Sequence, residues 1–399
     1  MNAIHPSLLK ESRKKIVPRQ LANTDHLVLF AALALLIIGW LVMTSASIYN
    51  AERLYQNPFH FSIRQAIYIA LGGMLGVCVF VVPIKEWSRL STPIILLGTL
   101  LLCLVLIPGV GSEINGSRRW FRLGFFNVQP SELVKLGTIL YMASYLVRRQ
   151  QQVRESVQGF LVPVGVLSII GTLLLAEPDF GATVVIFATA MGMLFLVGVR
   201  LTYFLTFVTA IVVMMAILIV TASYRLARFV SFMDPWAERF GNGYQLVHSL
   251  IGIARGEWFG LGIGASIQKL HFLPEAHTDF VFAILSEEMG ALGALAVIGL
   301  FGLFLWRAFQ IGQVSEDLGQ KFSAYLAYGL SLCIGLQALI NIGVNTGVLP
   351  TKGITLPLMS YGGSSMLVSM VMVAFLIRID WENRQLIKNG QMPIREKYR

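Results

Sequence analysis

The hydrophobic residues of this chain fall into ten long, continuous runs separated by polar segments. The runs cover residues 27–48, 65–83, 91–108, 132–147, 160–176, 181–199, 201–222, 280–306, 322–346 and 361–379. A helix needs about 20 mainly apolar residues to cross a bilayer. Runs that are continuous and do not alternate exclude the strands of a membrane barrel. The pattern therefore predicts an all-α polytopic membrane protein with ten transmembrane helices.

The pattern is weakest between the fifth and sixth runs, which are short and separated only by residues 177–181. Proline and glycine in this segment are able to end a helix. A turn here gives ten spans. A kink would instead join the two runs into one span and move every later segment to the opposite side of the membrane. Glu177 and Asp179 flank Pro178 and have three readings: turn-forming residues, cation ligands or partners for arginines.

Charge placement supports ten spans with both termini in the cytoplasm. With that orientation the inner segments contain 19 lysines and arginines and the outer segments contain 11, five of them in one long loop. Short cytoplasmic segments carry such an excess of positive charge. The predicted organisation is a basic cytoplasmic tail (1–26), a single membrane domain (27–379) with a large periplasmic loop (223–278) between spans 7 and 8, and a cytoplasmic tail (380–399).

Composition agrees with a membrane protein. Of the 399 residues, 56% are hydrophobic and 13% are charged, and the mean hydropathy is +0.70, whereas about 25% of the residues of a soluble domain are charged. The net charge of +10 is explained by inner-face cations near anionic lipid, so nucleic acid is not an expected partner. Cys78, Cys103 and Cys333 lie in apolar runs without metal-ligand spacing and predict neither a disulfide nor a redox site.

Outer-face cations gather in two places. The long loop holds Arg225, Arg228, Arg239, Arg255 and Lys269 and ends at Asp279, at the boundary of the eighth apolar run. The second group, Arg118, Arg119 and Arg122, is interleaved with aromatics including Trp120. The guanidinium fork suits phosphate oxygens, which indicates a site for an anionic ligand. The alternative is that these arginines contact lipid phosphates or anchor the chain at the interface.

Ionisable residues inside apolar runs are costly, and by default they indicate function. Glu132 and Lys135 stand three apart on one helix face and are able to pair, either as a structural tie between helices or as part of a site. Glu287 and Glu288 must find partners or bind protons, as in a proton-coupled transporter.

Two further segments are shaped for the outer face. Residues 244–256 carry an apolar helical stripe and are expected to lie in the interface or re-enter the membrane. Residues 347–365 contain two prolines, four glycines and a lone Lys352, which predicts a non-helical segment buried in protein or lining a wet cavity. Asn341 and Asn345, four apart in the preceding span, are expected to face inward.

Three blocks of sequence resemble the SEDS family (shape, elongation, division, sporulation). They are EPDFGAT (177–183), PEAHTDFVFAI (274–284) and LPTKGITLPLMSYGGSS (349–365). NGSRRW (115–120) and QPSE (129–132) support the resemblance, which samples nearly all of the membrane region. The chain is most similar to the branch of the family that acts in cell division.

The resemblance implies ten spans and a multi-pass protein of the bacterial cytoplasmic (inner) membrane at the division septum. It implies peptidoglycan glycosyltransferase activity on lipid II, a disaccharide-peptide carried on undecaprenyl pyrophosphate. The implied partners are a class B penicillin-binding protein that crosslinks the new strand, other divisome membrane proteins, lipid II itself and membrane lipid. The proposed catalytic aspartate of the family is Asp279 in this sequence.

This chemistry needs a base for the attacking sugar hydroxyl and positive charge for the leaving pyrophosphate. We expect Asp279 to be the base of a single inverting displacement. No cofactor and no metal-ligand set is predicted, although a divalent cation is compatible with the reaction. The residues expected to bind substrate are Lys352, Arg118, Arg119, Trp120, Arg225, Arg228, His277, Ser360 and Ser364, and those expected to support them are Glu132, Lys135, Asp179 and Glu275.

Two alternatives stay open at the level of sequence. A lipid II flippase would also need charged residues that line a cavity, but it should offer headgroup contacts on both faces. A non-catalytic divisome scaffold would tolerate changes at Asp279 and Lys352. Polymer formation from lipid II by the purified protein in detergent distinguishes the enzyme from both.

Overall fold

The computed structural model describes residues 25–114, 117–124, 126–221, 223–351 and 353–390. A helix covers each of the ten predicted spans. These helices are α2 (Asp25–Tyr55), α3 (His60–Val81), α4 (Ile84–Val105), α5 (Pro130–Arg148), α7 (Val157–Ala176), α8 (Phe180–Val197), α9 (Leu201–Val220), α12 (Val281–Asp317), α13 (Lys321–Asn345) and α14 (Gly363–Lys388).

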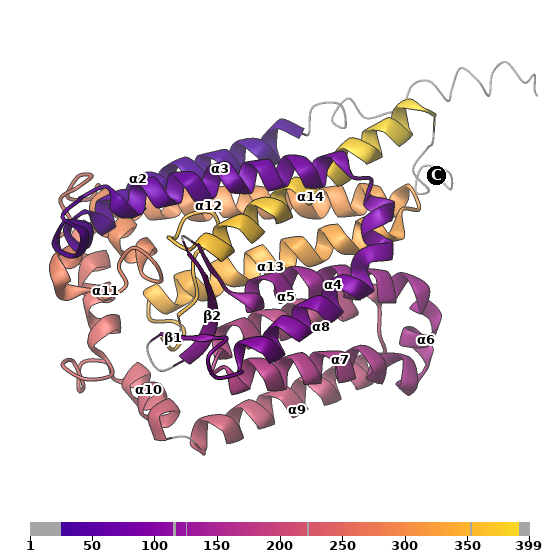
Figure 1. The fold of residues 1–399 in the computed structure, drawn as a ribbon, viewed down its shortest axis with the longest axis horizontal. Helices are drawn as coiled ribbons and strands as arrows, with labels where there is room; N and C mark the ends of the chain where they lie inside the picture. Colours follow the sequence, from indigo (N-terminus) through magenta and orange to yellow (C-terminus); the bar gives the residue numbers. More distant parts are fainter. Residues whose placement is uncertain (1–24, 115–116, 125, 222, 352, 391–399) are drawn as a thin grey trace, which may run out of the picture.

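In the described part of the chain, eight of these helices are long and apolar enough to cross a membrane, all except α5 and α9. The helices confirm the predicted polytopic helical architecture. The number that cross the membrane and their sidedness stay predictions. Figure 1 shows the short α6 (Gln150–Glu155) and the end of α14 at one end of the bundle. Helices α10 (Ser223–Met233) and α11 (Tyr244–Gly256) lie at the other.

Residues 177–181 form a turn and not a kink. Helix α7 ends at Ala176 and α8 begins at Phe180. The two helices pack as a hairpin, since a Cβ placed on Gly171 would lie 2.6 Å from the ring of Phe187. The predicted separation into two helices is therefore confirmed.

The all-α prediction missed a small antiparallel sheet between α4 and α5. It consists of β1 (Ser112–Ile114), β2 (Ser117–Leu123) and β3 (Phe126–Val128), in the order β1-β2-β3. The cation-aromatic segment, for which an anion site and an interfacial anchor were the two readings, is thus strand β2 at the centre of this sheet (Figure 1). Strands of three residues are too short to show the alternating pattern on which recognition of a strand depends.

Several helices are longer than the predicted apolar runs. Helix α4 begins seven residues before the run at 91–108, and α12 continues to Asp317, beyond the run at 280–306. The added turns contain polar residues such as Lys85 and Glu86. Hydropathy identifies the part of a helix that suits lipid, whereas the helix itself continues wherever its backbone hydrogen bonds are made.

Helix α12 is interrupted at Gly290, whose φ of 67° and ψ of −170° are non-helical. The freed backbone groups are paired by the chain that follows α11. Ala291 and Leu292 donate their amides to the carbonyls of Glu257 and Trp258, and the amides of Leu261 and Gly262 donate to the carbonyls of Glu287 and Glu288. The first part of α12 is therefore fixed against the loop, immediately after Asp279.

Candidate active site

Asp279 lies in the irregular segment that precedes α12, beside the 349–362 loop. Its side chain is partly exposed, and a Cβ placed on Gly353 would lie 3.0 Å from its Oδ2. Among the described residues no donor forms a hydrogen bond or ion pair with this carboxylate. Lys352, which directly precedes Gly353 in sequence, lies outside the described residues.

The surroundings of Asp279 favour its protonated form. Burial, and next the charge of Glu275, raise the pKa of the Asp279 carboxyl to about 7, while Arg119 opposes the shift. A carboxyl group with a pKa in this range is able to accept and release a proton near neutral pH. This is the property that a general base requires.

Arg119 lies between two acidic groups. From β2 it donates through Nε to the carbonyl of Glu177 at 2.9 Å and through Nη2 to that of Pro178 at 2.5 Å. It also opposes the raised pKa of both Asp279 and Glu177. The sheet thus carries a guanidinium group to the α7–α8 turn, close to the candidate base.

Glu177 has a more unusual environment than its sequence indicates. The residue is fully buried, and neither carboxyl oxygen has a hydrogen-bond partner among the described residues. Burial, and next the charge of Asp179, raise the pKa of Glu177 to about 8, with Arg119 opposing. Sequence reasoning left its role open, and its position before a Pro-Asp turn gave no signal of complete burial.

Asp179 forms the N-cap of α8. Its Oδ1 accepts from the Ala182 amide at 3.1 Å, and its Oδ2 accepts from Gln129 Nε2 and Ser131 Oγ, both at 3.0 Å. These bonds satisfy helix amides and join α8 to the start of α5. Of the three roles left open, the structure supports the turn-forming one for Asp179.

A row of amide side chains on α13 holds the site together. Gln337, Asn341 and Asn345 are spaced by four residues and are all buried. Gln337 Nε2 donates to the Thr355 carbonyl at 3.0 Å, and Asn341 Nδ2 donates to the Ile354 carbonyl at 2.6 Å. The inward direction predicted for the two asparagines is confirmed. Gln337 was missed, although the same spacing of four identifies it.

The remaining predicted cations and Trp120 are placed by their elements. Arg118 pairs at 3.2 Å with Glu113 across β1 and β2, with both side chains well exposed. Trp120 is half-buried on β2. Arg225 and Arg228 belong to α10, and their side chains lie outside what the structure describes. Arg119 is the described arginine whose charge acts on Asp279.

The predicted polar residues of the two loops bond within the protein. Ser360 Oγ accepts from the Leu356 amide at 2.8 Å, and Ser364 Oγ bonds to the backbone of Asn127 and Gln129. His277 packs against Tyr361 and Phe61, with its Nδ1 buried and without a partner among the described residues. These hydroxyls fix the loop beside Asp279, and a substrate-binding role for the three side chains stays a prediction.

Glu275 adopts a positive φ of 58°. Its carboxylate accepts a hydrogen bond from Thr278 Oγ1 at 2.8 Å. This local bond holds the charge of Glu275 within the turn that leads to Asp279, where it raises the pKa of the aspartate.

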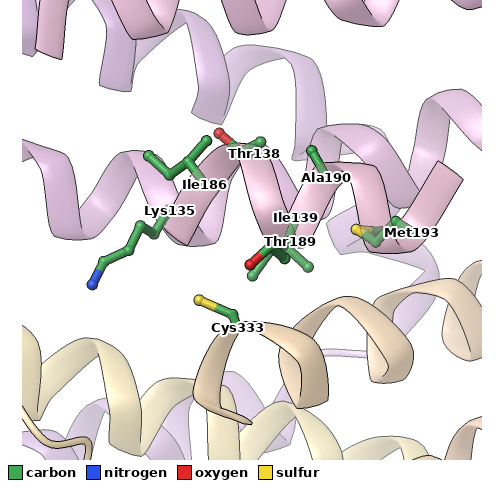
Figure 2. Close-up of a pocket in the computed structure, with 8 residues that line it drawn as sticks. All are labelled: Lys135, Thr138, Ile139, Ile186, Thr189, Ala190, Met193 and Cys333. Carbon is green, nitrogen blue, oxygen red and sulfur yellow. The ribbon is translucent and has the colours of Figure 1, made fainter. Parts of the chain in front are cut away.

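Glu132 and Lys135 form a buried ion pair at 2.8 Å. Lys135 Nζ also donates to Gln337 Oε1 at 2.9 Å, which joins α5 to the amide row. Figure 2 shows the space beside Lys135, which leaves no room for a water molecule. The lining residues are Lys135, Thr138, Ile139, Ile186, Thr189, Ala190, Met193 and Cys333. The pair therefore ties helices together and does not line an open ligand site.

Two of the five loop cations face carboxylates of α12. Lys269 Nζ lies 3.1 Å from Glu288 Oε1, and Arg255 Nε lies 3.8 Å from Glu287 Oε1. Ser266 also donates to Glu287. These contacts supply the partners that the two buried glutamates require, so Lys269 is not available to an external anion.

No group of three or more metal-binding side chains occurs in the described ranges of the chain. The geometry brings the Asp279 carboxyl, whose pKa is raised to about 7, against the backbone of Gly353 and within the electrostatic influence of the Arg119 guanidinium. This arrangement is suited to removing a proton from a hydroxyl beside a bound anion.

Comparison with known proteins gives a consistent result. A family model described as cell cycle protein, which covers FtsW, RodA and SpoVE, matches residues 25–385. The chain is 48% identical over 384 residues to the probable peptidoglycan glycosyltransferase FtsW of Legionella pneumophila, with 96% of this chain and 97% of that protein covered. A protein of the same name from Nitrosococcus halophilus is 50% identical over 373 residues, with coverage of 94% and 96%.

Solved structures have the same fold. A chain described under "Structural coordination of polymerization and crosslinking by a peptidoglycan synthase complex" matches with a TM-score of 0.73 and 28% identity, over 90% of this chain and 98% of that one. The rod shape determining protein RodA of Thermus thermophilus matches with a TM-score of 0.66 and 26% identity, over 89% and 96% of the two chains.

Proposed function

This chain belongs to the FtsW, RodA and SpoVE family of cell cycle proteins, and from that premise we propose that it polymerises lipid II with Asp279 as the catalytic base. It is a bacterial membrane protein and a peptidoglycan glycosyltransferase, the activity in the names of its full-length relatives. The substrate, the residues and their roles are the proposed part.

The observation that carries the mechanism is the environment of Asp279. Its carboxylate has no protein donor in the described part of the chain, and the pKa of this group is raised to about 7. An aspartate that served only the fold would accept hydrogen bonds from the protein, as Asp179 does at the N-cap of α8. A carboxylate kept available near neutral pH fits the removal of a proton from substrate.

In the proposed reaction, Asp279 accepts the proton of the acceptor sugar hydroxyl as that oxygen attacks the anomeric carbon of the donor. The bond from this carbon to the phosphate oxygen breaks, and its electron pair leaves with undecaprenyl pyrophosphate. The displacement inverts the anomeric centre. Asp279 later releases its proton to solvent, which restores the base.

The developing negative charge on the pyrophosphate requires fixed cations. Arg119 is the described cation whose charge acts on Asp279. Lys352, Arg118, Arg225 and Arg228 complete the proposed set, and a divalent cation bound to the pyrophosphate would add to their charge. Trp120, His277, Ser360 and Ser364 are the proposed contacts to the rest of the substrate.

We also propose that the chain acts at the division septum with a class B penicillin-binding protein and other divisome membrane proteins. The support is the solved neighbour that belongs to a peptidoglycan synthase complex and the two relatives named FtsW.

The test is polymerisation of lipid II by the purified protein in detergent, with and without the partner. We expect glycan strands from the natural chain and a loss of about 100-fold or more with Asp279→Asn, because a positioned base contributes about 10²–10⁴-fold. The variant should fold and bind the partner normally. Retained polymerisation by Asp279→Asn would remove the base, and no polymer from the natural chain with its partner would favour a flippase or a scaffold.

A further inference from the structure

The first amides of α12 have no partner within the helix, as at the start of any α-helix. Ala283 is the third residue of α12, and a helix that began one residue earlier would pair its amide with the Asp279 carbonyl. The Ala283 amide instead donates to Asn345 Oδ1 at 3.1 Å and to the Phe280 carbonyl at 3.0 Å. The Asp279 carbonyl accepts from Asn345 Nδ2 at 3.0 Å. One carboxamide thus stands between the two groups that would bond if the helix were extended.

Asn341 holds the same carbonyl from the next turn of α13. Its Nδ2 lies 2.8 Å from the Asp279 carbonyl and 2.6 Å from the Ile354 carbonyl. Ile354 follows Gly353, the residue whose backbone faces the Asp279 carboxylate. A single amide group therefore fixes the backbone of the base relative to the loop opposite it.

Both asparagines are themselves held rigidly. They are buried, with 1% and 0% of their surface exposed, and their polar atoms are paired. Asn345 Nδ2 also donates to the Asn341 carbonyl at 2.9 Å, and the Asn345 carbonyl accepts from Ser249 on α11 at 2.7 Å. Burial of a carboxamide is costly unless its hydrogen bonds are made. These bonds therefore allow the two asparagine side chains to be buried here.

We propose that Asn345 and Asn341 are positioning residues that keep Asp279 outside α12 and directed at the 353–354 segment. This inference rests on the proposed function. Without the Asn345 carboxamide, the Ala283 amide and the Asp279 carbonyl are left to bond each other. Extension of an existing helix by one bond is favourable, and it would rotate the carboxylate away from Gly353.

The test compares lipid II polymerisation by Asn345→Leu, Asn341→Leu and the natural chain. Leucine has the same number and branching of side-chain heavy atoms as asparagine but cannot make the bonds. We expect the turnover number to fall about 10- to 100-fold, the loss that follows a displacement of about 1 Å in a reacting group. The Michaelis constant should change less than about threefold, since neither asparagine contacts substrate in the proposed mechanism.

A matched control is Asn383→Leu. Asn383 is also buried and bonded, to Ser315 Oγ at 2.9 Å and to the Ile311 carbonyl at 3.2 Å, but it belongs to the last turns of α14, which ends at Lys388. That end of α14 lies at the opposite end of the bundle from α11 (Figure 1). Turnover within about threefold of normal is expected for this variant. If Asn345→Leu does not fold, Asn345→Asp decides the question, because it keeps the size and an oxygen for the Ala283 amide and loses the donor to Asp279.

The pH profile separates positioning from a general loss of folded protein. Among the described residues, the charged groups that act on Asp279 are Glu275 on its own segment and Arg119 on β2. Release of the carboxylate from its packed position should move the acid limb of the rate profile to lower pH, whereas loss of folded protein scales the profile without moving it.

Turnover reduced as expected, with a displaced acid limb, supports the inference. Turnover within about threefold of normal in both leucine variants, or a uniformly scaled profile, overturns it. Asp279→Asn in the same assay reports on the proposed function separately. If that variant polymerises normally, the base is wrong and the positioning role falls with it.

Discussion

Asp279 holds its proton over a pH range in which an exposed aspartate is ionised, since the pKa of the group is raised to about 7. A general base acts only when deprotonated, so the rate of polymerisation should rise through pH 6 and 7 and level off above. Glu275 adds to the upward shift. We therefore expect Glu275→Gln to move the acid limb to lower pH and to increase the rate at pH 6.

Initial rates measured between pH 5.5 and 8.5 check this prediction. Glu257→Gln is the control, because this glutamate lies on the same loop and has no part in the pKa shift of Asp279. An acid limb that stays in place in Glu275→Gln would contradict the assigned environment of the base.

Sequence reasoning identified Asp279 because it stands where a polar loop meets an apolar run within a recognisable block. It did not identify what sets the properties of that residue. Complete burial of Glu177, the bonds of Ser364 to the backbone before α5, and the carboxamide of Asn345 at the start of α12 all depend on contacts between segments far apart in sequence. Local residue patterns carry little information about such contacts.

At the scale of elements, the apolar runs predicted the helices well because a helix that crosses lipid needs a long, continuous stretch of apolar residues. The short sheet and the interruption of α12 lack such a signal. Gly290 sits in a glycine-rich apolar stretch, and nothing in that stretch distinguishes it from Gly299 or Gly302. Only the loop that packs against it requires its conformation.

That difference predicts opposite effects for two similar substitutions in α12. Gly290 has a positive φ, and a Cβ there would lie 2.4 Å from the Gly260 amide nitrogen, so Gly290→Ala should destabilise the fold by several kcal/mol or prevent folding. A Cβ on Gly299 meets nothing within 4 Å. Gly299→Ala should therefore be neutral or stabilise by about 0.5–1 kcal/mol.

Thermal unfolding of the two variants in detergent measures the contrast. Equal melting temperatures for Gly290→Ala and Gly299→Ala would show that the interruption of α12 is not needed for the fold. A selective loss in Gly290→Ala would show that the paired loop fixes this part of the molecule.

At the scale of the whole molecule, the candidate chemistry lies at one end of the bundle. Asp279 directly precedes α12 near α11, while α6 and the end of α14 lie at the opposite end (Figure 1). The excess of lysine and arginine in the segments at the α6 end predicts that this end faces the cytoplasm. On that prediction the candidate base lies on the outer side, with the cations of the two outer segments.

One buried charge cluster joins the loop after α11 to α2. Lys269 Nζ donates to Ser45 Oγ at 2.8 Å and to the Gly264 carbonyl at 2.6 Å, and it pairs with Glu288. Ser45 also donates to Glu288 Oε1 at 2.5 Å. The cluster thus connects α2, the loop after α11 and α12.

Removal of one partner from a buried pair leaves an uncompensated charge, which costs about 3–5 kcal/mol. Lys269→Met should therefore lower the melting temperature strongly, and Lys269→Met with Glu288→Gln should recover most of the loss, since the double variant buries no unpaired charge. Arg239→Met, at an exposed cation of the same loop, should change stability by less than about 0.5 kcal/mol. If Lys269→Met and Arg239→Met behave alike, the cluster does not join the three elements. If the double variant recovers the loss, the uncompensated charge is its cause, and the buried ion pair joins the loop after α11 to α2 and α12.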